Sequence, residues 1–508
     1  MSYIKNYIKF NTESGNTYVF DNVKSLVFPY NDIEYQILDN YYDKNKDVVL
    51  ENLSEQYKLP LDQINHYYTY IDTLIKEGHF YKEECNNIIY SNFREHDLYN
   101  IPASQLILIV TENCNIRCKY CVYSEQYPHF KGYSSKKINF EKAKRSVDYY
   151  AELHNMRVAC GYKGEPFVTF YGGEPFLEFD LICKIVEYCN TVLPNSKYHL
   201  TTNGTILDDE IIEFIIQNKF VVTFSLDGNK DNHDRNRYFS GNKGTFDLVY
   251  KNICKLQERK KQLNISAPIA FNCCYDNHTD LAKALEFYNK NEELFSPCNI
   301  VFNEVYKYDT EYYNNFNSSE DLQKELQENR KVFLKSLKEE YIDSLTSYKK
   351  CSNIANSFFS SLGIFARRPN TSNVSSTCLP GTKIAVAPDG NIYLCEKMCQ
   401  SLPIGDVEKG LDFTKINNTI ERFNEIKKEN CSECKLSSLC SLCYAFLIKD
   451  EGLVFNKEYC EDTKVSLLKT LNMIYTVLEK NPDAYKSMPN HMKKIFFEEY
   501  NMKEGSKP

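Results

Sequence analysis

The sequence predicts an α/β protein whose central part is a partial (β/α)6 TIM barrel. From residue 104 onward, short apolar runs of strand length alternate with amphipathic helical patterns. Such alternation is typical of parallel strands joined by right-handed crossovers. Six repeats of strand and helix fall short of the eight that close a full barrel.

The elements of this central part follow one another in a regular order. The predicted strands are Leu106 to Thr111, Phe167 to Tyr171, Tyr198 to Thr202, Val221 to Leu226, Ile265 to Asn272 and Ile300 to Val305. The predicted helices are Phe140 to Leu153, Leu181 to Val192, Asp209 to Gln217, Phe246 to Lys260 and Leu281 to Tyr288. Together they define a domain over residues 101–307.

Residues 1–100 form a separate small α+β unit in this interpretation. Two strands, Tyr3 to Phe10 and Asn16 to Phe20, flank a Ser-Gly-Asn turn, and three amphipathic helices follow at Ile33 to Tyr42, Leu50 to Tyr57 and Leu61 to Glu77. Leu59-Pro60 and Gly78 punctuate these helices. The unit is small for a catalyst, so a binding role is the better hypothesis.

The remaining chain divides into two parts. Residues 308–377 are predicted as a helical bridging region; to about residue 350 they are strongly charged and helical, as in Glu320 to Glu340, which favours a solvated face or linker. Residues 378–508 begin with a cysteine-dense stretch, to about residue 460, that shows little regular periodicity, and they end in helices. The cysteine-dense stretch predicts a fold organised by metal rather than by a large apolar core.

Composition limits the classes of function. A chain of 508 residues exceeds one hydrophobic core, and a net charge of -8 without a basic stripe excludes nucleic acid as the main partner. No leader segment and no apolar run of bilayer length is present, so we expect a cytoplasmic protein without a membrane partner. The twenty cysteines cluster at close spacings, which is typical of metal ligands in a reducing compartment.

Three cysteines follow the first strand of the central domain. Cys114-x3-Cys118-x2-Cys121 stands at the carboxyl end of that strand, where barrel active sites are built. Three thiolates can hold three irons of a [4Fe-4S] cluster and leave the fourth iron open for a ligand. A zinc site or three buried cysteines is the alternative, although structural zinc sites usually take four ligands.

This motif resembles the signature of the radical S-adenosylmethionine (SAM) superfamily, CxxxCxxC with an aromatic residue, here Tyr120, before the last cysteine. The resemblance implies that Cys114, Cys118 and Cys121 form the catalytic centre. It also implies that the amino and carboxylate groups of SAM chelate the open iron, and that Tyr120 packs near the adenine.

Further marks of the family stand behind the later strands. Gly172-Gly173-Glu174-Pro175 follows the second strand; its glycines allow close backbone approach, and Glu174 can accept hydrogen bonds from the methionine ammonium. Asn203 and Ser225 follow the third and fourth strands, and by resemblance they contact the ribose or carboxylate of SAM. Each mark alone can be an ordinary turn, and their order behind successive strands makes the set specific. His233-Asp234-Arg235-Asn236-Arg237 is also similar to the family, without an assigned role.

The second group of cysteines resembles the SPASM domain, which binds two auxiliary [4Fe-4S] clusters. Its members are Cys378, Cys395 within Gly390-x4-Cys395, Cys431-x2-Cys434-x5-Cys440-x2-Cys443 and Cys460. The resemblance implies a distal cluster on Cys431, Cys434, Cys440 and Cys460, and a proximal one on Cys378, Cys395 and Cys443. The spacing Cys440-x2-Cys443 is one residue shorter than the usual family pattern.

The proximal set leaves one iron without a protein ligand unless Cys351 or Cys399 completes it. An open iron can bind a substrate thiolate and lower its pKa. An ordinary four-cysteine electron relay is the alternative, and a zinc ribbon at Cys431 to Cys443 is another. The other cysteines, including Cys160, Cys183, Cys273 and Cys274, are expected to be buried apolar residues.

The N-terminal unit resembles the winged-helix-like recognition element of enzymes that modify ribosomally made peptides. Such elements add an extended leader peptide to a sheet edge. The three parts together imply a maturase with three [4Fe-4S] clusters and SAM, served by an external one-electron donor of the flavodoxin or ferredoxin type. It would form thioether crosslinks of the sactipeptide or ranthipeptide kind, starting from hydrogen abstraction by a 5'-deoxyadenosyl radical.

Other functions remain open at this stage. They are carbon-carbon crosslinking, formylglycine formation in sulfatases, and a non-catalytic peptide-binding scaffold. In sulfatase maturases an Asp directly after the Gly-x4-Cys cysteine acts as base, whereas this sequence has Glu396.

Overall fold

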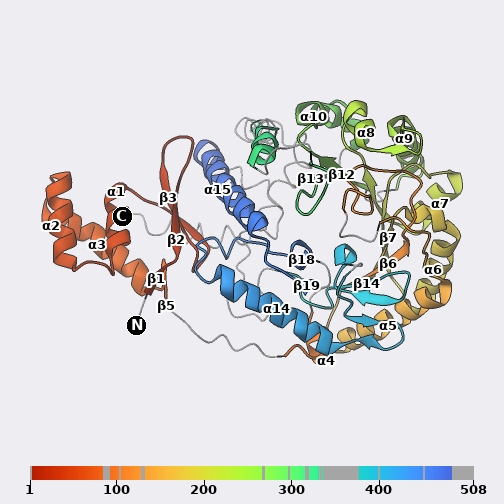
Figure 1. The fold of residues 1–508 in the computed structure, drawn as a ribbon, viewed down its shortest axis with the longest axis horizontal. Helices are drawn as coiled ribbons and strands as arrows, with labels where there is room; N and C mark the ends of the chain where they lie inside the picture. Colours follow the sequence, from red (N-terminus) through yellow and green to blue (C-terminus); the bar gives the residue numbers. More distant parts are fainter. Residues whose placement is uncertain are drawn as a thin grey trace.

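A computed structural model describes residues 3–83, 92–101, 104–127, 132–265, 269–295, 298–314, 320–329, 331, 335, 377–398, 401–449 and 452–482. In this part of the chain the central element is a sheet with the strand order β13-β12-β9-β8-β7-β6-β14-β15-β16-β17 (Figure 1). Six of its strands run parallel and follow chain order: β6 (Gln105–Thr111), β7 (Phe167–Gly172), β8 (Lys197–Thr202), β9 (Val221–Ser225), β12 (Ile269–Tyr275) and β13 (Asn299–Glu304). The predicted α/β fold is confirmed.

Helices lie in the crossovers between these strands. They are α5 (Phe140–Ala159), α6 (Phe179–Val192), α7 (Asp209–Gln217), α9 (Phe246–Gln262) and α10 (Leu281–Lys290), with the shorter α4 (Glu95–Tyr99), α8 (Lys230–Asn236) and α11 (Glu292–Phe295). Figure 1 shows the long helices in an arc along one side of the strands. Their bounds agree with the predicted helices within a few residues, because each carries a strong apolar period of 3.6 residues.

The two faces of the parallel strands have different neighbours. On β6, Leu106, Leu108 and Val110 belong to the large core shared with the helices. The alternate residues Ile107 and Ile109 pack in a second cluster with Ala385, Ala387 and Tyr393. Both faces are therefore apolar, as expected for buried parallel strands.

The sheet continues into the cysteine-dense part of the chain. β14 (Lys383–Val386) pairs in parallel with β6, and β15 (Asn391–Tyr393), β16 (Gly405–Asp406) and β17 (Gly410–Leu411) extend it with antiparallel pairs. Two long helices follow, α14 (Phe413–Cys431) and α15 (Lys457–Lys480). Regular periodicity is therefore present in this stretch, contrary to the sequence interpretation, since α14 buries one face through residues such as Ile416, Ile420 and Phe423.

The N-terminal unit contains a three-stranded antiparallel sheet and three helices. The elements are β2 (Tyr7–Asn11), β3 (Thr17–Asp21), β4 (Leu26–Pro29), α1 (Asp32–Asn40), α2 (Lys46–Tyr57) and α3 (Leu61–Lys76), with a separate pair of β1 (Tyr3–Lys5) and β5 (Tyr81–Glu83). The strand predicted from Tyr3 to Phe10 is divided at Asn6, and β4 was not predicted. The three helices agree with the prediction.

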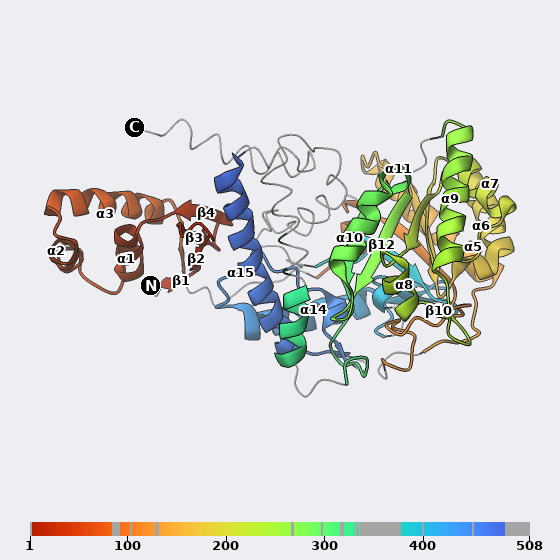
Figure 2. The same ribbon diagram turned by 90° about the horizontal axis from the view of Figure 1, so that it is seen from above.

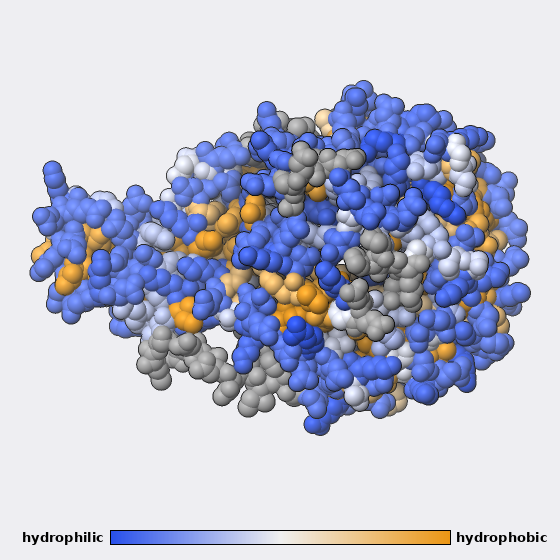
Figure 3. All heavy atoms as spheres, in the orientation of Figure 1, coloured by the Kyte–Doolittle hydropathy of each residue, from blue (hydrophilic) through white to orange (hydrophobic). Residues whose placement is uncertain are grey.

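The sheet of this unit is covered on both faces. Tyr7, Val19 and Phe28 pack against the helices of the unit, whereas Phe10 and Phe20 pack in a cluster with residues of α15. Figure 2 shows α15 standing between the N-terminal unit and the α/β part. Figure 3 shows a mostly hydrophilic face with several apolar patches, some of them near this junction.

Several short elements complete the described chain. They are β10 (Tyr238–Phe239), β11 (Lys243–Gly244), β18 (Ile448–Lys449) and β19 (Gly452–Leu453). Within the predicted bridging region, residues 320–329 are helical. Among the described residues, no helix combines the length and the apolar composition that a membrane span requires.

Candidate active site

The first group of cysteines lies in the loop that follows β6. Cys114 and Cys118 are buried and Cys121 is half-buried. Burial raises the pKa of the Cys118 thiol; Arg237 opposes this shift, and Cys121 and Cys114 add to it. The structure therefore brings the three sulfurs within electrostatic reach of one another at the carboxyl edge of the parallel strands.

Two glycines hold the end of β7 against this loop. A Cβ atom on Gly172 would lie 2.2 Å from the backbone oxygen of Thr111, and one on Gly173 would lie 2.1 Å from that of Asn113. The backbone N–H of Gly173 donates to Thr111 over 2.8 Å, and that of Glu174 donates to Asn113 over 2.9 Å. Only glycine fits this approach of two backbones.

The carboxylate of Glu174 is fully buried and bound by the protein itself. Its Oε1 accepts from the N–H of Phe176 (3.1 Å) and the hydroxyl of Thr202 (2.8 Å), and its Oε2 accepts from the N–H of Asn203 (2.7 Å). Burial raises the pKa of Glu174 to about 7, and these hydrogen bonds oppose the shift. In the described structure, the side chain of Glu174, which was predicted to accept hydrogen bonds from the methionine ammonium, links the end of β7 to the end of β8 through hydrogen bonds.

The side chain of Asn203 faces the cysteine loop. Its Nδ2 donates to Cys114 Sγ (3.6 Å) and to Asn115 Oδ1 (2.9 Å), and its Oδ1 accepts from the N–H and hydroxyl of Thr205. Ser225, the other predicted polar contact, ends β9 opposite Asn272 of β12. Both residues therefore stand at the expected edge, and Asn203 additionally contacts a cysteine sulfur.

A buried charged network beside Cys118 was not predicted. The hydroxyl of Tyr120 donates to Asp227 Oδ2, and Arg237 Nε donates to the same oxygen over 3.0 Å. Arg237 also donates through Nη1 to Cys118 Sγ over 3.6 Å, and its guanidinium lies over the Tyr120 ring at 5.2 Å. In the sequence, Asp227 follows Ser225 closely and Arg237 ends the His-Asp-Arg-Asn-Arg stretch, but no spacing pairs one with the other.

The predicted distal set of cysteines is also brought together. Burial, and then Cys440, Cys434 and Cys460, raise the pKa of Cys431 to about 11. Cys434 donates its backbone N–H to Cys431 over 3.1 Å, and Cys460 lies in the first turn of α15. These four cysteines come from the end of α14, the following loop and the start of α15.

The predicted proximal set forms a separate group. Burial and then Cys443 raise the pKa of Cys378. Burial and then Glu396 raise that of Cys395 to about 12, and Cys443 adds to this shift. Cys351 and Cys399, which could complete this set, lie outside the described residues.

The carboxylate of Glu396, next to Cys395, is engaged by Lys383. Lys383 Nζ lies 3.1 and 3.0 Å from the two oxygens of Glu396, whose side chain is largely buried.

The remaining cysteines differ from the expectation of burial in one clear case: Cys273 is buried, Cys183 and Cys274 are half-buried, and Cys160 is exposed.

The residues around the first group fit a cluster held by three thiolates. Nitrogen donors of Asn203 and Arg237 face two of the sulfurs, as suits thiolates that carry negative charge on a cluster. Among the described residues, no three His, Cys, Asp or Glu side chains are arranged around a single metal ion. A four-iron cluster separates its thiolate ligands more widely than a single ion does.

Comparison with known proteins identifies the class of the central domain. Residues 108–268 match the family model of the radical SAM superfamily, so the chain contains a radical SAM domain. This domain comprises the cysteine loop after β6 and the edge that carries Glu174, Asn203 and Ser225.

Particular relatives are anaerobic sulfatase maturases. The chain is 31% identical over 200 residues to the cysteine-type anaerobic sulfatase-maturating enzyme of Clostridium novyi (strain NT), covering 38% of this chain and 51% of that enzyme. It is 25% identical over 353 residues to the enzyme of the same description from Clostridium perfringens (strain ATCC 13124), covering 67% of this chain and 88% of that enzyme. The chain spans about half the length of two of the curated relatives that it matches, 46% and 51%.

A solved structure shares the fold. Native anSMEcpe with bound AdoMet and Cp18Cys peptide superposes with a TM-score of 0.53 at 21% identity, covering 74% of this chain and 99% of that chain. About a quarter of this chain therefore extends beyond the shared fold.

Proposed function

We propose that this chain is a radical SAM maturase that forms thioether crosslinks in a ribosomally made, cysteine-containing peptide. The observation that carries the proposal is the separation of ten cysteines into three groups. One group of three stands at the carboxyl edge of the radical SAM domain, and one of three and one of four stand in the C-terminal part.

The finer architecture belongs to the same proposal. The six parallel strands form the partial (β/α)6 TIM barrel of residues 101–307, and residues 1–100 form the winged-helix-like domain. Residues 308–377 bridge to a SPASM domain and C-terminal helices at 378–508. A cytoplasmic location agrees with the reducing conditions that free thiols require.

Three [4Fe-4S] clusters and SAM are the cofactors in this proposal. When bound, they supply an electron and a carbon radical that removes a hydrogen atom from the peptide. Cys114, Cys118 and Cys121 hold the first cluster, and Asn203 and Arg237 donate to its sulfurs. Tyr120, Gly172, Gly173, Glu174 and Ser225 shape the SAM site beside it.

Formation of one thioether removes two hydrogens from the peptide. A C–H and an S–H bond break and a C–S bond forms; one hydrogen atom is abstracted, one proton leaves the thiol, and one electron passes to an auxiliary centre. The three cysteines Cys378, Cys395 and Cys443 leave a coordination position for the substrate thiolate unless Cys351 or Cys399 fills it. An external flavodoxin or ferredoxin supplies the reducing electron.

The N-terminal unit is the docking site for a leader peptide in this proposal. Its sheet order β2-β3-β4 leaves β4 at an edge of the described sheet. An extended peptide can add to such an edge through main-chain hydrogen bonds, beside a helix of the unit.

Formylglycine formation is the second candidate, favoured by the alignment with 88% of a cysteine-type sulfatase maturase. The residue after Cys395 is Glu396 instead of Asp, and Lys383 contacts both of its oxygens. This ion pair must open before the carboxylate of Glu396 can take a proton from a substrate.

Mass spectrometry of peptides treated with the anaerobically reconstituted enzyme, SAM and reductant tests the proposal. We expect deoxyadenosine, a loss of two hydrogens per crosslink and thiols that no longer react with an alkylating reagent. An aldehyde that reacts with a hydrazine probe would establish formylglycine formation instead. Absence of deoxyadenosine would contradict both and favour a binding scaffold.

A further inference from the structure

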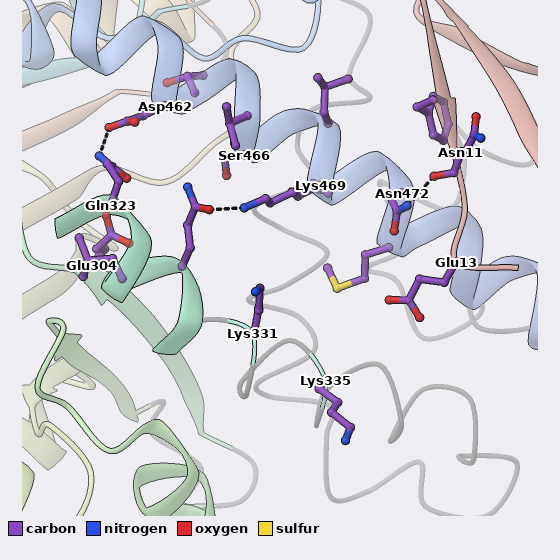
Figure 4. Close-up of a pocket in the computed structure, with 18 of the residues that line it drawn as sticks. Asn11, Glu13, Glu304, Gln323, Lys331, Lys335, Asp462, Ser466, Lys469 and Asn472 are labelled. Atoms are coloured by element: carbon purple, nitrogen blue, oxygen red, sulfur yellow. Dashed lines mark hydrogen bonds between the residues drawn. The ribbon is translucent and has the colours of Figure 1, made fainter. Parts of the chain in front are cut away.

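A cavity of about 800 Å³ lies where the N-terminal unit, α15 and the described residues 320–329, 331 and 335 meet (Figure 4). Its walls come from three segments that are distant in the sequence: β2, the helical residues after 320, and one side of α15. Its apolar lining consists of Phe10, Leu326, Val465, Leu468 and Met473. Its volume is within the usual range of ligand sites.

The cavity extends from the N-terminal unit to the carboxyl edge of the parallel strands. At one end, Lys9, Phe10 and Asn11 belong to β2, the edge strand opposite β4. At the other end, Glu304 closes β13, and Leu326 packs in the same cluster as Cys114 and Cys118. A chain docked on the N-terminal unit can pass through this cavity toward the radical site.

Positive charge exceeds negative charge in the lining. Five lysines face three carboxylates, and the full set is Lys9, Lys307, Lys331, Lys335, Lys469, Glu13, Glu304 and Asp462. Lys307 lies 3.1 Å from both Glu304 and Asp462, so this end of the cavity carries one net negative charge. The positive excess therefore falls on Lys9, Lys331, Lys335 and Lys469.

The ion pairs of Lys9 and Lys331 are weak. Lys9 is half-buried and lies 3.4 Å from the exposed Asp32, and Lys331 and Glu328 are both exposed; pairs open to solvent contribute little free energy. Lys469 donates to the side-chain amide oxygen of Gln327 over 2.6 Å, as Figure 4 shows. A carboxylate of a ligand can replace these partners at little cost in free energy.

The remaining polar lining suits the main chain of an extended peptide. Asn11, Gln323, Gln327 and Asn472 present amides that both donate and accept. The Nδ2 of Asn472 donates to the backbone oxygen of Asn11, so α15 supplies side-chain donors along the edge of β2.

We propose that this cavity binds an acidic segment of the substrate peptide and holds it between the N-terminal unit and the radical site. The proposal rests on the proposed function insofar as the substrate is a peptide. Carboxylates of the segment contact Lys331, Lys335 and Lys469, its main chain contacts the amides, and its apolar side chains lie on Phe10 and Leu468.

Fluorescence anisotropy with the cluster-loaded protein tests this assignment. The probe is a short fluorescein-labelled peptide of alternating Glu and Gly, compared with its Gln-for-Glu counterpart. We expect the Glu peptide to bind more tightly and its affinity to fall as salt is added. Lys469→Glu should weaken binding about tenfold, with Lys469→Gln between it and the unchanged protein.

Lys251→Glu on α9 is the matched control, because Lys251 is exposed and does not line the cavity. Equal binding by Lys469→Glu and Lys251→Glu, or equal binding of the Glu and Gln peptides, would overturn the assignment. Deoxyadenosine formation without peptide separates the two proposals. If the unchanged protein binds the Glu peptide as expected but forms no deoxyadenosine, only the proposed function is contradicted. If it forms deoxyadenosine but Lys469→Glu does not weaken peptide binding, only the assignment of the cavity is contradicted.

Discussion

The side-chain amide of Asn203 donates toward the sulfur of Cys114 over 3.6 Å. Hydrogen bonds to cluster sulfurs raise the reduction potential because they stabilise the more negative state. Asn203→Ala should therefore lower the potential of the first cluster by about 40 mV, the equivalent of one hydrogen bond of about 1 kcal/mol. An electron paramagnetic resonance redox titration measures this shift. Asn190→Ala, which removes an exposed amide bonded to Tyr198, should leave the potential unchanged, and equal potentials in both variants would contradict the role of Asn203.

His233 gives the fold a dependence on pH. It is fully buried; its Nδ1 accepts from the N–H of Asp227 (3.3 Å), and its Nε2 lies 3.0 Å from the hydroxyl of Thr245. Burial, and then the charge of Arg237, lower its pKa from 6.5 to about 3. Below pH 6.5 the unfolded chain binds a proton that the folded chain rejects. The contribution of neutral His233 to the free energy of unfolding is therefore fully present above pH 6.5. It is lost as the pH falls toward 3, by about 1.4 kcal/mol per pH unit.

Urea unfolding at neutral and mildly acidic pH, compared between the unchanged chain and His233→Gln, measures this contribution. Gln keeps a polar group at the site but does not titrate. We expect the unfolding free energy of the unchanged chain to fall more steeply with acidification than that of the variant. Parallel slopes would show that His233 does not carry the dependence.

Single residues show what the sequence could predict about the site. Cys114, Glu174 and Asn203 were found because each stands in a short motif at a strand end. The pairing of Arg237 with Asp227 and Cys118 could not be predicted, because it depends on how α8 folds back over the cysteine loop. Residues that come together only when the chain folds leave no fixed spacing in the sequence from which their contact could be predicted.

At the scale of elements, the contact between β7 and the cysteine loop depends on Gly173. A Cβ atom there would meet the backbone oxygen of Asn113 at 2.1 Å, and backbone cannot move aside as a flexible side chain can. Gly173→Ala should displace the loop and lower iron from about twelve to about eight per chain, because only the first cluster is affected. Iron quantification after anaerobic reconstitution measures this.

Gly452→Ala is the control for this substitution. Gly452 has no heavy atom within 4 Å of the position of an added Cβ, and its backbone does not need a positive φ. We expect full iron content in this variant. The same iron content in both variants would show that the loop tolerates the displacement.

Local elements were predictable to different degrees. The helices were predicted well because their apolar periods are local. β14 was missed because its pairing with β6 joins segments separated by most of the chain, and a strand of four residues carries little signal of its own. β4 was missed for the same reason, since it is short and its partner β3 determines it.

At the scale of the whole molecule, the N-terminal unit is joined to the loop of the predicted distal cluster through Asn22. Its Nδ2 donates to Asn6 Oδ1 (2.8 Å), to the backbone oxygen of Cys434 (3.1 Å) and to Ser437 Oγ (3.0 Å), and its Oδ1 accepts from the N–H of Ser438 (2.8 Å). The apolar cluster of Phe10 and Phe20 with α15 lies beside it. The N-terminal unit and the loop of the predicted distal cluster therefore share one interface.

Asn22→Ala tests how strongly this interface holds the loop. The substitution leaves the N–H of Ser438 without its partner and removes one of the two donors to the oxygen of Cys434, the other being the N–H of Ser437. A buried donor left unpaired costs about 1–3 kcal/mol. Hydrogen exchange should become faster at the N–H of Ser438 and along α15 where it contacts the N-terminal unit, since both depend on the same contacts. Asn45→Ala removes the N-cap of α2 in the same unit, at a comparable loss of stability, without touching the loop. If the two variants exchange alike at Ser438, the unit and the loop are not coupled, because general destabilisation of the unit would then account for the whole effect.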